Sequence, residues 1–249
     1  MKRGEPKGRL ASQVAVTGGV LIAATVFLLC SPWPPLFDVR EVAVSGNVHV
    51  SAESAIRISG FRIGDHLVRL PTRRAARALS SLSWVKHVSI RRSCFHRVEI
   101  ALVERVPVAT FPDPTTGKGE WIVGEDGLLV QQTTAKLRPP LVLRGALVKG
   151  QPAPGARLAD RRVIALLAAL LRHRLTEGTF TVADFSDPTS VVLLGPDELT
   201  VLLGPVEGLE LRIDELGALF SAIDVTQYRS IDLRFGGEAT LVPRKVVKR

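Results

Sequence analysis

The stretch from Leu10 to Phe37 contains no charged residue, and this feature constrains the fold more than any other. Its apolar part, residues 10–30, would form a helix about 31 Å long, which matches the hydrocarbon thickness of a bilayer. A cleaved signal peptide usually has an apolar region of only about 7–15 residues and a cleavage site of small residues. The residues Phe27–Cys30 offer no such site. We therefore predict a retained transmembrane helix over residues 10–30.

The charges on either side of this stretch predict its orientation. The tail of residues 1–9 is basic, whereas the other flank is neutral until Asp38. Because positively charged flanks stay in the cytoplasm, the tail is expected inside and the bulk of the chain outside. Prolines in the linker 31–36 would end the helix, and Trp33 suits the membrane–water interface. We predict a single-pass protein of the plasma membrane with extracytoplasmic bulk.

The net charge of +9 does not indicate a nucleic-acid partner. The largest segment, residues 108–243, carries 13 basic and 17 acidic side chains, so the basic excess lies in residues 37–107 and at the two ends of the chain. Proteins that bind nucleic acid commonly combine a basic face with aromatic side chains. Here aromatic residues make up 5% of the chain and include one tyrosine. We expect no nucleic-acid partner.

Residues 37–107 show the pattern of a small α+β unit. An apolar alternation predicts a first strand over 37–44, and two short helices are expected after it, capped by Ser51 and Thr72. Two further strands are expected over 84–90 and 97–102, where apolar and polar residues alternate again. The order β-α-α-β-β is enough for one core against a three-stranded sheet.

Residues 108–243 predict a β-rich second unit with two helices, and residues 244–249 a basic tail. Leucines and isoleucines at helical spacing mark helices over 163–171 and 209–223. Short apolar runs separated by turn residues predict strands at 108–111, 121–123, 128–130, 141–143, 180–185, 191–194 and 199–203. The last two strands are expected at Ser230–Phe235 and Glu238–Val242, joined by Gly236-Gly237 as a tight hairpin.

Several phrases of the sequence resemble a known family. FDVREVAVSGN, LSSLSWVKHVSIRR and VEIALVERVPVA are similar to a POTRA domain. Together with the basic tail, the single span and the phrase IDLRFGG at 231–237, they resemble the FtsQ (DivIB) family of bacterial cell-division proteins. The resemblance implies an α+β protein with one N-terminal transmembrane helix, a POTRA domain at 37–107 and a β domain at 108–243.

The resemblance also implies a function. Family members act as non-enzymatic scaffolds of the divisome at the division site, where they bind FtsB-like and FtsL-like single-pass coiled-coil proteins, and the POTRA domain is expected to contact other division proteins. By position in the terminal motif, Arg234 would pair with an acidic residue of the partner and Phe235 would fill an apolar contact. Arg212 is a second candidate for an acidic contact.

The terminal strand is the candidate binding site. Because it comes last, one of its edges is expected to lack a neighbouring strand, and an open edge accepts a strand from another chain. Pro243 would then limit pairing along that edge. The predicted partner-binding residues lie in or beside the last two strands: Ile231, Leu233, Arg234, Phe235, Glu238, Ala239, Thr240, Leu241 and Val242.

The sequence offers little support for catalysis. Ser83 and Lys86 fit the S-x-x-K pattern of penicillin-binding enzymes, but S-D-N and K-T-G are missing. The five histidines lack the spacing of metal ligands, and Cys30 and Cys94 are interpreted as lone small apolar residues. We expect no enzyme, metal site or cofactor. Two alternatives stay open, a POTRA-type chaperone or assembly factor and a membrane-anchored cell-wall enzyme.

Overall fold

The computed structural model describes residues 37–93, 96–115, 117, 119–176, 178–205, 207–235 and 237–244, together with Gly19, Ala23, Val26 and Phe27. In this part of the chain no helix has both the length and the apolar character needed to cross a bilayer. Most of the predicted span at 10–30 lies outside the described residues, as do the tail 1–9, the linker 31–36 and both cysteines.

A three-stranded sheet with two helices forms the first part of the structure. Its strands are β1 (Glu41–Ser45), β2 (Val85–Ser93) and β3 (Arg97–Glu104), in the order β1-β3-β2. Strand β3 runs parallel to β1 and antiparallel to β2. Between β1 and β2 lie α2 (Ala52–Ser59), the short 3-10 helix η2 (Leu67–Arg69) and α3 (Thr72–Ser80). The predicted order β-α-α-β-β is confirmed.

The two helices begin in different ways. Ser51 caps α2 as predicted, because its hydroxyl accepts the N–H of Ser54. The prediction that Thr72 caps α3 is wrong, since Thr72 is already the first helical residue. Pro71 stands at the cap position, where its carbonyl accepts the N–H groups of Arg74 and Ala75. A proline suits this place because it has no N–H to satisfy.

The turn after β1 depends on a glycine. Gly46 has a φ of +73°, in the left-handed region that favours glycine. A Cβ atom at this position would also collide with the carbonyl oxygen of Leu102 on β3. The chain can therefore leave β1 close to the sheet only because residue 46 has no side chain.

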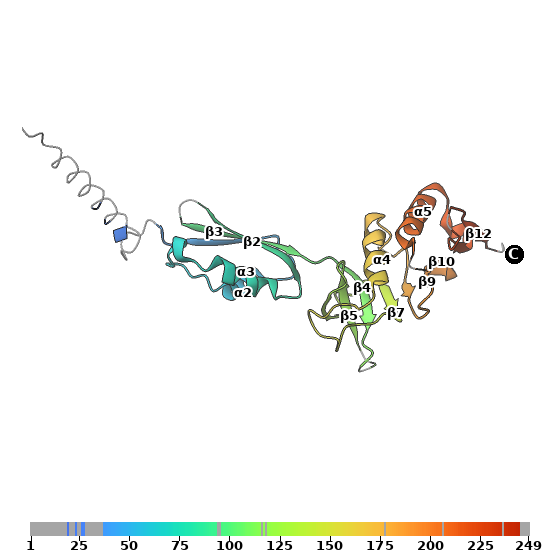
Figure 1. Ribbon diagram of the computed structural model, residues 1–249, viewed down its shortest axis with the longest axis horizontal. Helices are drawn as coiled ribbons and strands as arrows, with labels where there is room; N and C mark the ends of the chain where they lie inside the picture. Colours follow the sequence, from blue (N-terminus) through green and yellow to red (C-terminus); the bar gives the residue numbers. More distant parts are fainter. Residues whose placement is uncertain are drawn as a thin grey trace, which may run out of the picture.

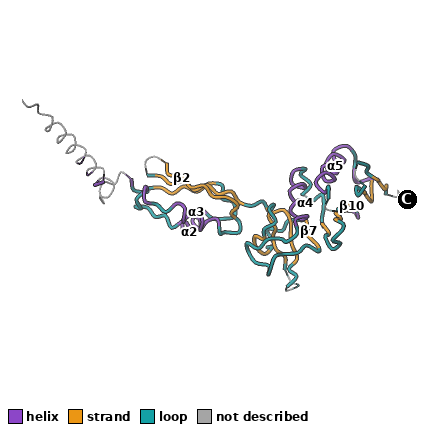
Figure 2. Tube along the Cα trace, viewed as in Figure 1, coloured by secondary structure: helices purple, strands orange, loops and turns teal. Residues whose placement is uncertain are grey.

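A nine-stranded sheet forms the second part, in the order β12-β11-β10-β9-β8-β7-β4-β5-β6. Two helices, α4 (Arg161–Arg172) and α5 (Leu209–Ala222), contact each other and lie on one side of the sheet (Figure 2). Two 3-10 turns, η3 (Pro196–Glu198) and η4 (Val225–Gln227), precede β10 and β11. The strands are β4 (Pro107–Pro112), β5 (Glu120–Gly124), β6 (Leu129–Gln132), β7 (Leu141–Arg144), β8 (Val182–Asp184), β9 (Val191–Leu194), β10 (Thr200–Gly204), β11 (Tyr228–Asp232) and β12 (Thr240–Pro243).

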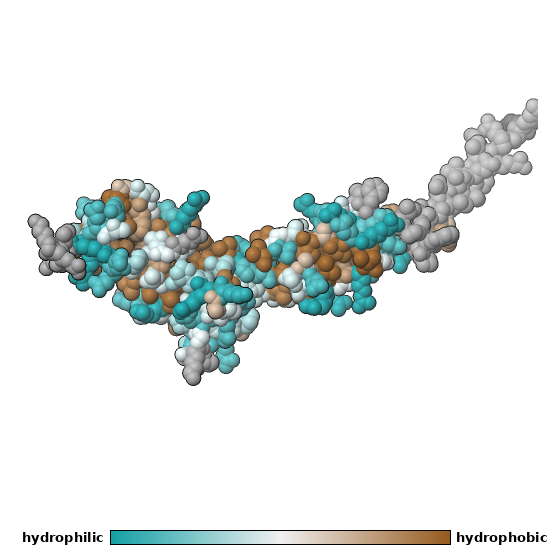
Figure 3. Space-filling view, turned by 180° about the vertical axis from the view of Figure 1, so that it is seen from behind, coloured by the Kyte–Doolittle hydropathy of each residue, from teal (hydrophilic) through white to brown (hydrophobic). Residues whose placement is uncertain are grey.

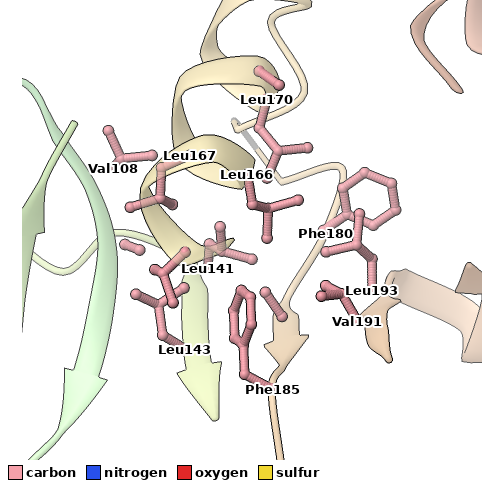
Figure 4. Packing of buried hydrophobic residues seen from close by; sticks show 14 of the residues in the cluster. Val108, Leu141, Leu143, Leu166, Leu167, Leu170, Phe180, Phe185, Val191 and Leu193 are labelled. Carbon is pink, nitrogen blue, oxygen red and sulfur yellow. The ribbon is translucent and has the colours of Figure 1, made fainter. Parts of the chain in front are cut away.

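Helix α4 closes the main core of the second sheet. Leu166, Leu167 and Leu170 are fully buried on its inner face. They point toward Leu141 and Leu143 of β7, and toward the aromatic rings of Phe180 and Phe185 beside β8 (Figure 4). This apolar stripe matches the helical spacing seen in the sequence, so the predicted helix over 163–171 is confirmed.

A buried arginine joins the two sheets. Arg105 follows β3 and is only 9% exposed. Its Nε lies 3.0 Å from the carboxylate of Asp126, and its Nη1 donates to the carbonyls of Ser83 and Val85. Ser83 lies just before β2 and Val85 is the first residue of that strand, whereas Asp126 lies between β5 and β6. One guanidinium therefore connects the end of the first sheet to the second sheet.

Three further hydrogen bonds reinforce this junction. The carboxylate of Glu125 accepts the N–H of Val106 at 2.7 Å and the Nζ of Lys86 at 2.9 Å. The indole of Trp84 donates to the side chain of Gln131 at 3.0 Å. The described part of the molecule is elongated, with the three-stranded sheet toward one end and β12 at the other (Figure 1).

Candidate partner-binding edge

Strand β12 forms one end of the second sheet. It pairs antiparallel with β11, with Thr240 opposite Asp232 and Val242 opposite Ser230. Among the described strands, β11 is the only neighbour of β12. An edge strand of this kind presents backbone N–H and C=O groups that no strand of the sheet uses.

The direction of these backbone groups follows from one hydrogen bond. The N–H of Arg244 donates to the carbonyl of Gln227, so residue 244 faces the β11 side. The register of the two strands shifts at one point, where β11 contains an extra residue. Along β12, successive residues therefore still face opposite edges in regular alternation. Because successive residues of a strand direct their N–H and C=O groups to opposite edges, Leu241 and Pro243 face the open edge. Pro243 has no N–H, which shortens the length over which another strand can pair.

The last hairpin differs from the prediction. The predicted strands Ser230–Phe235 and Glu238–Val242 are too long at their facing ends, because β11 ends at Asp232 and β12 starts at Thr240. The side chain of Asp232 accepts the N–H of Arg234 at 3.0 Å, and this local bond turns the chain away from the strand direction. The connection between β11 and β12 is therefore longer than the two-residue turn that was predicted.

The predicted site residues fall into a buried and an exposed group. Ile231 and Leu233 belong to the core, at 0% and 2% exposure, so only their backbone lies near the surface. The exposed group includes Phe235, whose ring is 77% exposed, and Val242. Leu241 is half-buried against the core. The remaining members of the exposed group are Arg234, Glu238, Ala239 and Thr240.

Arg234 already has an acidic partner within the chain. Its guanidinium binds the carboxylate of Asp232 at 2.6 Å and lies 5.4 Å from the centroid of the Phe235 ring. The hydrogen bond from Arg234 lowers the pKa of Asp232 below its usual value, although burial opposes this shift. The same bond raises the pKa of Arg234. An acidic residue of a partner would therefore have to compete with Asp232.

The prediction that Arg212 contacts a partner is wrong. Its side chain is buried at 4% exposure, and the guanidinium donates to the carbonyls of Pro205, Glu207 and Gly208. Gly204 has a φ of +69°, and a Cβ there would lie within 3.1 Å of Arg212 and 3.0 Å of Arg234. Arg212 thus stabilises the turn between β10 and α5.

The sequence analysis missed an exposed apolar residue near this edge. Leu211 of α5 is exposed, and it lies one helical turn before Glu215, whose carboxylate accepts the N–H of Gly237 at 3.3 Å. The face of α5 that carries Leu211 therefore adjoins the β11–β12 connection. The sequence does indicate that Leu211 is exposed, because Leu209, Ile213 and Leu216 share one helical face and Leu211 lies outside that face.

In the described part of the chain, no three His, Cys, Asp or Glu residues are grouped so that they could hold a metal ion. At the far end of the β11–β12 pair lies a hollow of about 420 Å³, lined by Thr226, Gln227, Tyr228, Pro243 and Arg244. Lys86 of the S-x-x-K pattern forms an ion pair with Glu125.

Comparison with known proteins identifies the first sheet. A sequence profile described as "POTRA domain, FtsQ-type" matches residues 37–105. The chain carries a POTRA domain of the FtsQ type. This POTRA domain comprises the three-stranded sheet with α2 and α3, and the match ends at Arg105, the junction residue. The edge at β12 lies outside the match.

Relatives extend this similarity beyond the POTRA domain. The chain is 28% identical over 191 residues to the cell division protein FtsQ of Mycobacterium leprae, covering 75% of this chain and 52% of the relative. It is 25% identical over 189 residues to FtsQ of Mycobacteroides abscessus, covering 75% and 57%. FtsQ of Corynebacterium glutamicum is 26% identical over 95 residues, covering 38% and 43%. The predicted resemblance to the FtsQ family is confirmed, and the chain spans about half the length of the curated relatives it matches.

Proposed function

We propose that the protein is a non-enzymatic cell-division scaffold that binds FtsB-like and FtsL-like single-pass proteins at the edge of β12. The observation that carries the proposal is an edge strand, β12, with backbone groups that no described strand uses, connected to β11 by a segment that exposes Phe235. The FtsQ-type POTRA domain and the FtsQ relatives support a role in cell division. Residues 10–30 anchor the scaffold in the plasma membrane with its bulk outside, at the division site.

The mode of binding is the addition of a strand to the sheet. A strand of the partner aligns beside β12 and bonds to the N–H and C=O of Leu241, while main-chain bonds supply affinity and side-chain contacts supply specificity. Phe235 and Val242 offer apolar contacts, and Glu238, Ala239 and Thr240 line the approach. Pro243 ends the paired segment. The POTRA domain is left free to contact other division proteins.

The change Phe235→Ala tests the apolar anchor. An aromatic hot spot contributes about 2 kcal/mol or more, so the dissociation constant for the FtsB-like partner is expected to rise about 30-fold. The measurement is a binding titration of the full chain in nanodiscs. Leu147→Ala is the matched control, since Leu147 is also an exposed apolar residue but follows β7. Unchanged affinity in the Phe235 variant, or an equal loss in both variants, would contradict the proposed anchor.

The change Asp232→Asn tests the role of Arg234. The variant keeps the oxygen that accepts the N–H of Arg234 but removes the charge that pairs with its guanidinium. If Arg234 binds an acidic residue of the partner, affinity should increase about threefold, in line with exposed ion pairs.

A matched control exists on β8. Asp184 likewise accepts an N–H two residues on, from Ser186, and pairs with Arg144 at 3.5 Å. Asp184→Asn should leave the partner affinity unchanged. Equal or weaker binding by the Asp232 variant would show that Arg234 makes no ionic contact with the partner.

A further inference from the structure

One end of the POTRA domain gathers the start of the described chain and the loop between α2 and α3. The N–H of Gly64 donates to the carbonyl of Val39, and the N–H of Val39 donates to the carbonyl of Asp65, each at 2.8 Å. The rings of Phe37 and His66 lie 6.2 Å apart. The loop 61–71 therefore shares this end of the domain with the residue at which the uncharged stretch 10–37 finishes.

This end exposes apolar side chains. Ile63 in the loop is 76% exposed, and Phe37 and Val68 are also exposed. All three belong to the segments that the bonds above hold together. In Figure 3 apolar and hydrophilic surfaces lie side by side on the POTRA domain where it meets the grey residues. Exposed apolar side chains that are grouped together are typical of a surface that binds a protein or a membrane.

The same end is strongly basic. Arg92 of β2 donates to the carbonyl of Leu70 at 2.8 Å, which places the end of β2 against the loop. The acidic side chains at this end are Asp38, Asp65, Glu41 and Glu99, and the last two both pair with Arg97, so the acidic side chains are outnumbered by the arginines. The exposed arginines at this end are Arg40, Arg62, Arg69, Arg73, Arg74, Arg91, Arg92 and Arg97.

The first turn of α3 adds to this charge. It contains Arg73 and Arg74 and no acidic residue. The positive end of the helix dipole disfavours basic side chains in the first turn, so this arrangement is stabilised when anions lie nearby. The charge pattern therefore favours an anionic surface over a neutral one.

The length of the linker decides which anionic surface is within reach. The residues from Cys30 to Phe37 extend to at most about 25 Å. A tether this short holds the exposed end at a high effective concentration next to the lipid, so that individually weak contacts suffice. Basic side chains that flank exposed apolar ones are typical of protein surfaces that bind the headgroup region of anionic membranes.

We propose that this end of the POTRA domain docks on the anionic lipid surface around the membrane anchor. Ile63 and Val68 enter the headgroup region, and the surrounding arginines bind anionic headgroups. The POTRA domain is thereby held in a fixed orientation at the membrane, and β12 at the other end of the molecule points away from it. The inference rests on the proposed anchor at residues 10–30.

The test uses the full chain in lipid vesicles, with Cys30 and Cys94 replaced by Ser. An environment-sensitive fluorophore is attached to Ile63→Cys, and its quenching by spin-labelled lipid is measured in vesicles with and without phosphatidylglycerol. Val48→Cys is the matched control, since Val48 is 82% exposed and its N–H binds Glu104 at the end of β3, far from the loop. Quenching at position 63 is expected to exceed that at 48 several-fold, only with phosphatidylglycerol.

A second variant separates charge from apolar contact. Arg62→Gln, Arg73→Gln and Arg74→Gln together should reduce the quenching at position 63 to the level of the control. A label at 63 that stays in water, equal quenching at 63 and 48, or quenching without any dependence on phosphatidylglycerol would each overturn the proposal. A label that is protected only when another division protein is added would also overturn it, in favour of a protein contact. Flotation of the chain with neutral vesicles reports the anchor separately, so its failure is distinguishable.

Discussion

Replacement of Arg105 by Met is expected to lower the free energy of unfolding at the junction by about 3 kcal/mol, because it leaves a largely buried carboxylate and two carbonyls without a donor. Met has a similar length and no charge, so the loss of hydrogen bonds dominates. The amide of Glu125, which donates to the carbonyl of Val106, reports opening of this junction by hydrogen exchange in the full chain. Its exchange should accelerate by about two orders of magnitude.

The control for this change is Arg138→Met. Arg138 forms an equally short ion pair, 2.8 Å from Glu120, but its side chain is 63% exposed. Exposed pairs of this kind contribute little, so junction exchange should not change. If the Arg105 variant exchanges as slowly as the control, the buried guanidinium does not hold the two sheets together. If it opens as expected, Arg105 is required, in addition to the contacts of Glu125 and Trp84, to fix the orientation of the POTRA domain relative to β12.

The role of Arg105 illustrates what the sequence does not contain. The phrase ERVPVA belongs to the part of the sequence that resembles a POTRA domain, and in the structure it contains the end of β3, the connection after it and the start of β4. Nothing in its spacing shows that Arg105 is buried, because its partners Ser83, Val85 and Asp126 come from distant parts of the chain. Burial of an arginine depends on three-dimensional packing, which local patterns cannot report. The same reason explains why Arg212 was expected at the surface.

Local sequence patterns predicted the positions of helices and strands better than they predicted which strands pair with each other. Helices α4 and α5 follow the apolar spacing of the sequence, and β3 shows the expected alternation of buried and exposed residues. The order of the strands was not predicted, since β7 pairs in parallel with both β4 and β8, and β10 pairs in parallel with β11. Such pairings join residues far apart in sequence.

At the candidate partner-binding edge, the sequence likewise did not show where β11 ends. The phrase IDLRFGG predicts the last hairpin correctly in kind, but the bond from Arg234 to Asp232 ends β11 before the glycines. A side chain that competes with the backbone for hydrogen bonds shifts a strand end by several residues. Phe235 thereby lies outside the strand, exposed in the connection between β11 and β12.

The change Leu241→Pro is expected to weaken binding of the FtsB-like partner about 100-fold. The N–H of Leu241 faces the open edge, so proline removes a bond to the added strand and places its ring in the path of that strand. A partner carbonyl buried without its donor and a steric block together account for this loss. The bonds between β12 and β11 come from the alternate residues, and proline is tolerated on the outer side of an edge strand. Affinity is measured by titration of the full chain in nanodiscs.

Two further variants make the result specific. Leu241→Val keeps the N–H and the apolar side chain, so it should bind the partner as the unchanged chain does. Thr240→Pro removes an N–H that faces β11, and it should increase hydrogen exchange throughout the β11–β12 pair in addition to reducing binding. The decisive comparison is a Leu241→Pro chain in which the amides of β11 and β12 remain protected. If that chain binds the partner as tightly as Leu241→Val does, no strand is added at this edge. The two proline variants remove N–H groups from opposite edges of β12. Weak binding by a Leu241→Pro chain with an intact hairpin therefore indicates that the partner binds the N–H on the open edge.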